Sequence, residues 1–159
     1  MKLGLDIYSI RSQDWDAIRK LDYCSELGIA LAHFGLGDLG TTDEGEVRAI
    51  KAHADELGID LELGTGSICE TSPNFHGEPG DAAIALSQAL DIAHLLGSPV
   101  LKVLLGGIAE RRTPEPLETH IRSCVATCKA VREQALDLGI TLAVENHGDL
   151  QGWELKALI

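Results

Sequence analysis

The sequence predicts an α/β protein built from parallel strand–helix units. The tripeptide Leu-Gly-Ile occurs three times, at 27–29, 57–59 and 138–140, and a looser copy, Leu-Gly-Ser-Pro-Val, spans 96–100. A helix-like stretch precedes each copy, and a short stretch rich in β-branched residues follows it. The intervals between these short stretches are long enough to hold a helix, which indicates parallel strands joined by right-handed crossovers.

The glycine of each copy is expected to end a helix, because glycine adopts the positive φ of that position without a Cβ clash. Strands are expected at 2–8, 29–34, 59–65, 100–105 and 140–145, and helices at about 13–27, 43–57, 80–96 and 114–138, with another starting near 151. The helix at 114–138 has the clearest pattern. Its apolar residues recur at spacings of three and four from Leu117 to Leu138, with Thr113 as N-cap and Pro114 at the first helical position.

Composition limits the class of protein. The chain has 159 residues, of which 45% are hydrophobic and 24% charged, and a net charge of −12. These values exclude a disordered chain and predict one domain over 1–159. The negative charge argues against a nucleic-acid partner, which would require an excess of Lys and Arg. No apolar run approaches the length of a membrane span, so no membrane partner is expected.

The N-terminus and the cysteines together predict a cytoplasmic protein. Asp6 interrupts the apolar stretch that an export signal would need. The four cysteines form no Cys-x-x-Cys pair, so a zinc ribbon or a thioredoxin-like site is not supported. We expect all four to be reduced thiols, with Cys124 and Cys128 packed in the core on the stripe of their helix.

Two architectures fit five strand–helix units. One is part of an eight-stranded (β/α) barrel, with about five of the eight units present, and the other is a five-stranded doubly wound sheet. A doubly wound sheet usually carries a glycine-rich phosphate loop after its first strand, but residues 8–12 contain no glycine. The Gly-Thr-Gly at 64–66 is interpreted as a turn. The barrel is therefore preferred, with strand order 1-2-3-4-5.

Polar residues gather at the expected carboxyl ends of the strands, where active sites of parallel sheets lie. They are His33, Glu62, Lys102, Glu145 and His147. Large apolar residues alternate with small or polar ones along the strand expected at 140–145. This alternation places Glu145 on the inward side of the strand, with Thr141 and Ala143. A carboxylate beside an amide and an imidazole can bind a divalent metal or act as a general base, although a surface cluster that caps the next helix has the same pattern.

Three segments carry a resemblance to a known family. They are Glu-Asn-His-Gly at 145–148, the stretch 92–103 that leads into Gly106-Gly107, and the opening strand at 3–9. Together they resemble the N-terminal part of the xylose isomerase-like TIM barrel superfamily, which includes sugar phosphate isomerases and epimerases. The resemblance covers essentially the whole chain, in order.

The resemblance implies a sugar or sugar-phosphate isomerase or epimerase that transfers a proton beside a carbonyl with the help of Mn²⁺ or Mg²⁺. Glu145 matches the metal ligand of strand five and would also be an acid–base group. His33, Lys102, His147 and Glu62 would bind substrate. Alternatives are a polyol dehydratase or a hydroxypyruvate-type isomerase of the same superfamily, and, in another class, a non-catalytic flavodoxin-like binding module.

The family's other three metal ligands come from strands six to eight, which these 159 residues do not include. One carboxylate does not hold a hard cation that takes about six ligands, so isomerase activity is not expected of the chain alone. Inside a barrel Lys102 needs a partner, for which Glu62 is the candidate, unless it binds a substrate phosphate instead. Inward faces that include Leu61 and Val103 would lack an opposite wall, which predicts weak stability or a homo-oligomer formed through edge strands.

Overall fold

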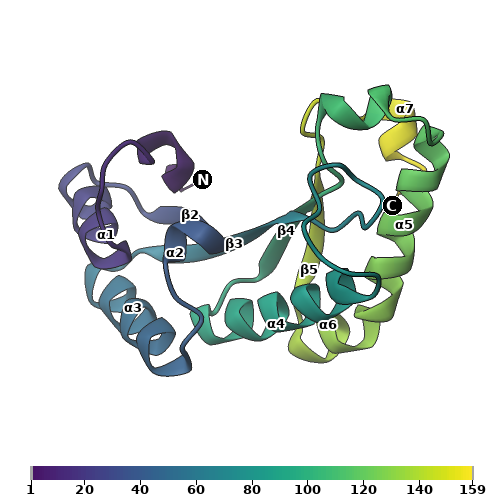
Figure 1. Cartoon of the computed structure of the whole chain (residues 1–159). Helices are drawn as coiled ribbons and strands as arrows, with labels where there is room; N and C mark the ends of the chain where they lie inside the picture. Colours follow the sequence, from purple (N-terminus) through teal and green to yellow (C-terminus); the bar gives the residue numbers. More distant parts are fainter. Residues whose placement is uncertain (1, 159) are drawn as a thin grey trace.

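The computed structural model describes residues 2–158 and contains one sheet of five parallel strands in the order β1-β2-β3-β4-β5 (Figure 1). This order confirms the barrel prediction and excludes the doubly wound alternative. The strands are β1 (Gly4–Asp6), β2 (Leu31–Gly35), β3 (Asp60–Ser67), β4 (Val100–Leu104) and β5 (Thr141–Glu145). Each strand hydrogen-bonds to the next one along the chain.

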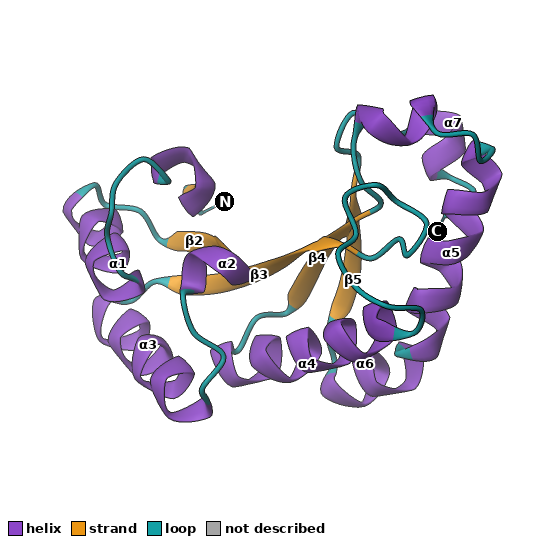
Figure 2. Ribbon diagram, viewed as in Figure 1, coloured by secondary structure: helices purple, strands orange, loops and turns teal. Residues whose placement is uncertain are grey.

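The longer helices lie along one face of the curved sheet, and the concave face carries none of them (Figure 2). They are α1 (Ala17–Glu26), α3 (Glu44–Leu57), α4 (Asp81–Leu96), α5 (Leu117–Ala130) and α6 (Arg132–Leu138). Two short helices, α2 (Leu36–Leu39) and α7 (Gly152–Leu155), and two 3₁₀ turns, η1 (Ile7–Ile10) and η2 (Ile108–Arg112), lie in the segments that follow strands. No helix within residues 2–158 is long and apolar enough to cross a membrane.

The ends of the helices follow the expected local chemistry. Asp16 and Asp43 begin α1 and α3 by accepting hydrogen bonds from backbone N–H groups of the first turn. The helices α3, α4 and α6 end on Gly58, Gly97 and Gly139, whose φ values are 69°, 68° and 68°. The repeated glycine is therefore the left-handed C-cap that the sequence predicted.

Boundaries differ from the prediction in the first strand and in the helices expected at 13–27 and 114–138, the first of which begins only at Ala17. The first strand ends at Asp6, because its carboxylate accepts the N–H of Tyr8 and begins the turn η1. The helix expected at 114–138 starts only at Leu117 and is interrupted at Val131, where φ is −105° and ψ is 4°. Thr113 is not its N-cap, since the Thr113 hydroxyl is hydrogen-bonded to the carbonyl of Glu110 and to the ring of His120.

The hydrophobic core lies between the sheet and the long helices. Leu61 and Val103 belong to this core, at 4% and 0% exposure, so the prediction that they face inward was wrong. Side chains alternate along a strand, and their neighbours Glu62 and Lys102 therefore point to the concave face. The four cysteines are free thiols; Cys124 is fully buried, and Cys128 is partly buried against the same core.

Candidate functional site

A cavity of about 360 Å³ lies on the concave face, at the carboxyl ends of the strands. The turn after β1 contributes to it, as do β2, β3, β4, β5 and the segment that follows β5. Its polar side chains come from segments far apart in the sequence: Asp6, Tyr8, His33, Asp38, Thr65, Lys102, Glu145 and His147. Four of the five predicted site residues are therefore brought together here.

Lys102 and Glu145 form the central ion pair of the cavity. Lys102 Nζ lies 2.7 Å from Glu145 Oε2, and both side chains are about one-third exposed. The hydrogen bond from Lys102 lowers the pKa of Glu145, although partial burial acts in the opposite direction. Glu145 is therefore ionised at neutral pH, with its charge balanced by the ammonium group.

Glu62 is not the partner of Lys102, so that prediction was wrong. The register places Glu62 opposite His33, and it places Lys102 opposite Gly64, two residues further along β3. Glu62 Oε2 accordingly lies 3.6 Å from Nδ1 of His33. Glu62 is not among the residues that line the cavity.

Gly64 makes room for two of the site side chains. A Cβ at this position would lie 2.8 Å from both His33 Nε2 and Lys102 Cε. The imidazole and the lysine stem therefore lie directly over the backbone of β3, and the turn predicted at 64–66 is instead part of that strand. His33 Nε2 is buried and has no hydrogen-bond partner within residues 2–158.

His147 is held by the loop after β4. Its Nδ1 lies 2.9 Å from the carbonyl oxygen of Gly106, and its backbone N–H donates to Asp149 Oδ1. Sequence reasoning missed Asp149, which is fully buried. The available signal was an acidic residue two positions after His147, next to an apolar leucine.

The described residues do not fit a complete divalent-metal site. No group of three or more His, Cys, Asp or Glu side chains within residues 2–158 is placed to hold a metal ion. Glu145, the expected ligand, already has an ammonium group against its Oε2. The Mn²⁺ or Mg²⁺ expected from the family resemblance would need ligands that these residues do not supply.

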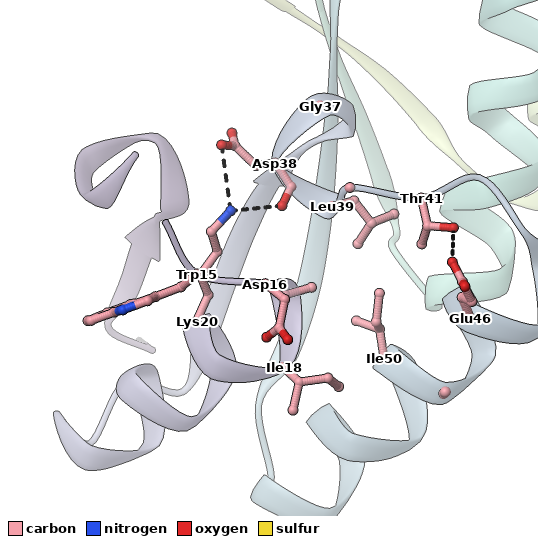
Figure 3. Close-up of a pocket in the computed structure, with 13 residues that line it drawn as sticks. Trp15, Asp16, Ile18, Lys20, Gly37, Asp38, Leu39, Thr41, Glu46 and Ile50 are labelled. Carbon is pink, nitrogen blue, oxygen red and sulfur yellow. Dashed lines mark hydrogen bonds and ion pairs between the residues drawn. The ribbon is translucent and has the colours of Figure 1, made fainter. Parts of the chain in front are cut away.

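A second cavity, of about 510 Å³, lies between α1, α2 and α3 (Figure 3). Its polar groups are engaged with one another: Lys20 Nζ donates to the carbonyl of Asp38 at 2.9 Å, and the Thr41 hydroxyl donates to Glu46. Gly37 and Asp38 line both cavities, so α2 forms a wall between them. The chemistry-bearing side chains point into the concave cavity, which is the candidate site.

No protein-family model and no curated protein matches the chain in sequence, but solved structures match it in fold. D-Psicose 3-epimerase from Clostridium cellulolyticum H10, crystallised with D-tagatose, superposes with a TM-score of 0.79 at 18% identity, over 99% of this chain and 60% of that one. D-Allulose 3-epimerase from Methylomonas, in complex with D-allulose, gives a TM-score of 0.70 at 17% identity, over 99% and 57%. The chain folds as five consecutive units of a xylose isomerase-like barrel. A xylose isomerase domain protein from Planctomyces limnophilus agrees, with a TM-score of 0.65 at 15% identity, over 99% and 58%.

The xylose isomerase-like fold explains why the five strands curve. They correspond to consecutive (β/α) units of a barrel, and the chain spans about 60% of the length of the solved structures that it matches. The concave face of the sheet corresponds to the barrel interior. The carboxyl ends of the strands, with Lys102 and Glu145, then lie at the mouth where barrel enzymes carry their active sites.

Proposed function

We propose that this chain forms the substrate-binding half of a sugar isomerase or epimerase that moves a proton on the carbon beside a carbonyl. The observation that carries the proposal is the Lys102–Glu145 pair at the mouth of a xylose isomerase-like sheet. The similar epimerase structures were crystallised with D-tagatose and D-allulose, which are both ketoses, and this supports a ketose as the substrate class.

In this proposal Glu145 accepts the proton. Its pKa is lowered by Lys102, so the carboxylate is available as a base at neutral pH. As Glu145 takes the proton, its negative charge is lost and the ammonium group of Lys102 is released from the ion pair. The ammonium can then donate to the sugar oxygen on which negative charge develops, so the charge moves from one partner of Lys102 to another.

The remaining polar residues of the mouth bind and orient the sugar. His33 lines the cavity, and Glu62 Oε2 lies 3.6 Å from its Nδ1. The proposed proton transfer does not use a divalent ion, because Glu145 is the only one of the expected metal ligands that residues 2–158 supply.

NMR titration of the 159-residue chain with D-tagatose tests the binding. We expect shifts at His33, Lys102 and Glu145, and weaker binding in Lys102→Met. The matched control is Lys51→Met, because Lys51 pairs with Asp55 on α3, away from the site. Titration with D-sorbitol, which lacks the carbonyl, shows whether binding depends on the carbonyl. Titration with D-tagatose 6-phosphate shows whether a phosphate strengthens binding. Shifts confined to the cavity between α1, α2 and α3, or no shifts at all, would contradict the proposal.

Deuterium exchange tests the proton transfer. In D₂O we expect slow incorporation of deuterium at the carbon beside the ketose carbonyl, reduced by roughly 10²–10⁴-fold in Glu145→Gln. Glu133→Gln, on the exposed surface of α6, is the control. If the chain binds the sugar but incorporates no deuterium, Glu145 is not a catalytic base in this chain, although the sugar-binding role stands.

A further inference from the structure

The hydrogen bond between His147 and Gly106 fixes which ring nitrogen carries the proton. A carbonyl oxygen only accepts, so Nδ1 of His147, at 2.9 Å, is the donor. A neutral imidazole has one N–H, and Nε2 therefore presents a lone pair. The ring lines the concave cavity, and Nε2 has no hydrogen-bond partner elsewhere in residues 2–158.

Asp149 holds the backbone on both sides of this hydrogen bond. The residue is 0% exposed. Its Oδ2 accepts the N–H of Gly106 at 3.1 Å, and its Oδ1 accepts the N–H groups of His147 at 3.1 Å and Leu150 at 2.8 Å. One carboxylate thus joins the segment that carries the imidazole to the segment that carries the carbonyl.

Glu110 fixes the loop of Gly106 from the other side. Glu110 is 1% exposed, and its Oε2 accepts the N–H of Gly107 at 2.7 Å. A Cβ at position 106 would overlap the Glu110 carboxylate, so only glycine fits there. The Gly106 carbonyl belongs to the same peptide group as the Gly107 N–H and points the opposite way, so the hydrogen bond to Glu110 directs the carbonyl toward the ring of His147.

We propose that His147 is a fixed hydrogen-bond acceptor for a sugar hydroxyl, and that Asp149 is the positioning residue that fixes its tautomer. The ligand class rests on the proposed function; the tautomer does not. A lone pair on Nε2 attracts a hydroxyl and repels a carbonyl oxygen, whereas the ammonium of Lys102 attracts the carbonyl. The two side chains together set the direction in which a ketose lies across the mouth.

Nitrogen-15 NMR of the histidine rings at alkaline pH, where imidazoles are neutral, tests the tautomer. We expect His147 to carry its proton on Nδ1, and the exposed His76 to show the Nε2–H form that free imidazole side chains favour in water. In Asp149→Asn the NH₂ group of the new amide would face the N–H of Gly106. Two donors would then lie against each other and displace the Gly106 loop, so the Nδ1–H population of His147 should fall. Asp137→Asn, at an exposed position of α6, should leave it unchanged.

An Nε2–H proton on His147 in the unmodified chain would overturn the proposal, whether or not Asp149→Asn folds. The same Nδ1–H population in a folded Asp149→Asn would remove the positioning role of Asp149.

The acceptor role is tested by adding D-tagatose. We expect the Nε2 resonance of His147 to shift, and His147→Phe to bind the sugar about 3- to 10-fold more weakly, the loss of one net hydrogen bond. Shifts at Glu145 and Lys102 with an unchanged His147 Nε2 would overturn the acceptor role alone. No shift anywhere on the concave face would overturn the acceptor role and the proposed function together, while the tautomer result would stand by itself.

Discussion

At the scale of single residues, one glycine decides whether the site can form. Gly64 lies in the middle of β3, with the ring of His33 and the stem of Lys102 passing over it. A larger residue would push both side chains away from the positions that the strand register gives them. The position is therefore a functional constraint rather than a turn, although the two uses of glycine look alike in the sequence.

Replacing Gly64 by alanine should destabilise the chain by about 1–3 kcal/mol, because the new Cβ overpacks against the imidazole. Urea unfolding measures the change. Gly66→Ala is the control, since no atom lies within 4 Å of a Cβ at that position. Equal stability of the two variants would mean that His33 does not lie over β3.

The Lys102–Glu145 pair should make stability depend on pH. Its hydrogen bond places the pKa of Glu145 in the folded chain below that of an unfolded glutamate, about 4.3. The stabilisation is therefore fully present above that unfolded value and is lost as the pH falls through the lower, folded value. The stability difference between the unmodified chain and Glu145→Gln should be largest near neutrality and disappear in acid. Glu133→Gln, in an exposed pair with Arg132, should show little dependence. A difference that grows as the pH falls would contradict the pairing.

At the scale of elements, the loops after β3, β4 and β5 are joined by buried carboxylates. Glu110 accepts hydrogen bonds from Ser72 and from Asn74 Nδ2, in the segment after β3, as well as from the N–H of Gly107. Burial opposes ionisation of Glu110, but these hydrogen bonds leave its pKa lowered. Asp149 joins the loop after β4 to the segment after β5. The mouth is thus a connected structure rather than a set of independent loops.

Glu110→Ala should cost about 2–4 kcal/mol, because it leaves the buried Ser72 hydroxyl and the partly buried Gly107 N–H without an acceptor. Hydrogen exchange should increase in the segments after both β3 and β4. Glu115→Ala, at an exposed position of the same loop, is the matched control. Faster exchange confined to the loop after β4 would show that Glu110 does not couple the two segments.

At the scale of the whole molecule, the sheet is open. Its edges are β1 and β5, and its concave face carries polar groups beside Leu31, Val100 and Leu104, which are only partly buried. Unpaired edge strands invite pairing with another chain. The net charge of −12 opposes association, but it does not satisfy backbone groups.

We therefore expect the 159-residue chain to self-associate at micromolar concentration. Sedimentation should give a mass above the 17.0 kDa of one chain, and the association should strengthen as salt screens the negative charge. A stable monomer with a sharp two-state melt at all salt concentrations would contradict this expectation.

The sequence by itself determined the succession of elements and most of the residues of the site. The repeated Leu-Gly-Ile units end helices and begin strands by local chemistry, and the carboxyl ends of parallel strands necessarily share one edge of the sheet. This was enough to bring His33, Lys102, Glu145 and His147 to one mouth. The strand order followed from the choice of the barrel over the doubly wound sheet, which depended on the lack of a glycine in residues 8–12.

Only the tertiary structure decided which of these residues are partners. The choice of Glu145 over Glu62 for Lys102 depends on the register between strands, and a shift by two residues changes every pair without changing the pattern of any one strand. The roles of Gly64 and Asp149 likewise arise from contacts between residues that lie 31 to 43 positions apart in the sequence. Such contacts leave no local periodicity in the sequence, because they are set by how the units pack and not by how each unit folds.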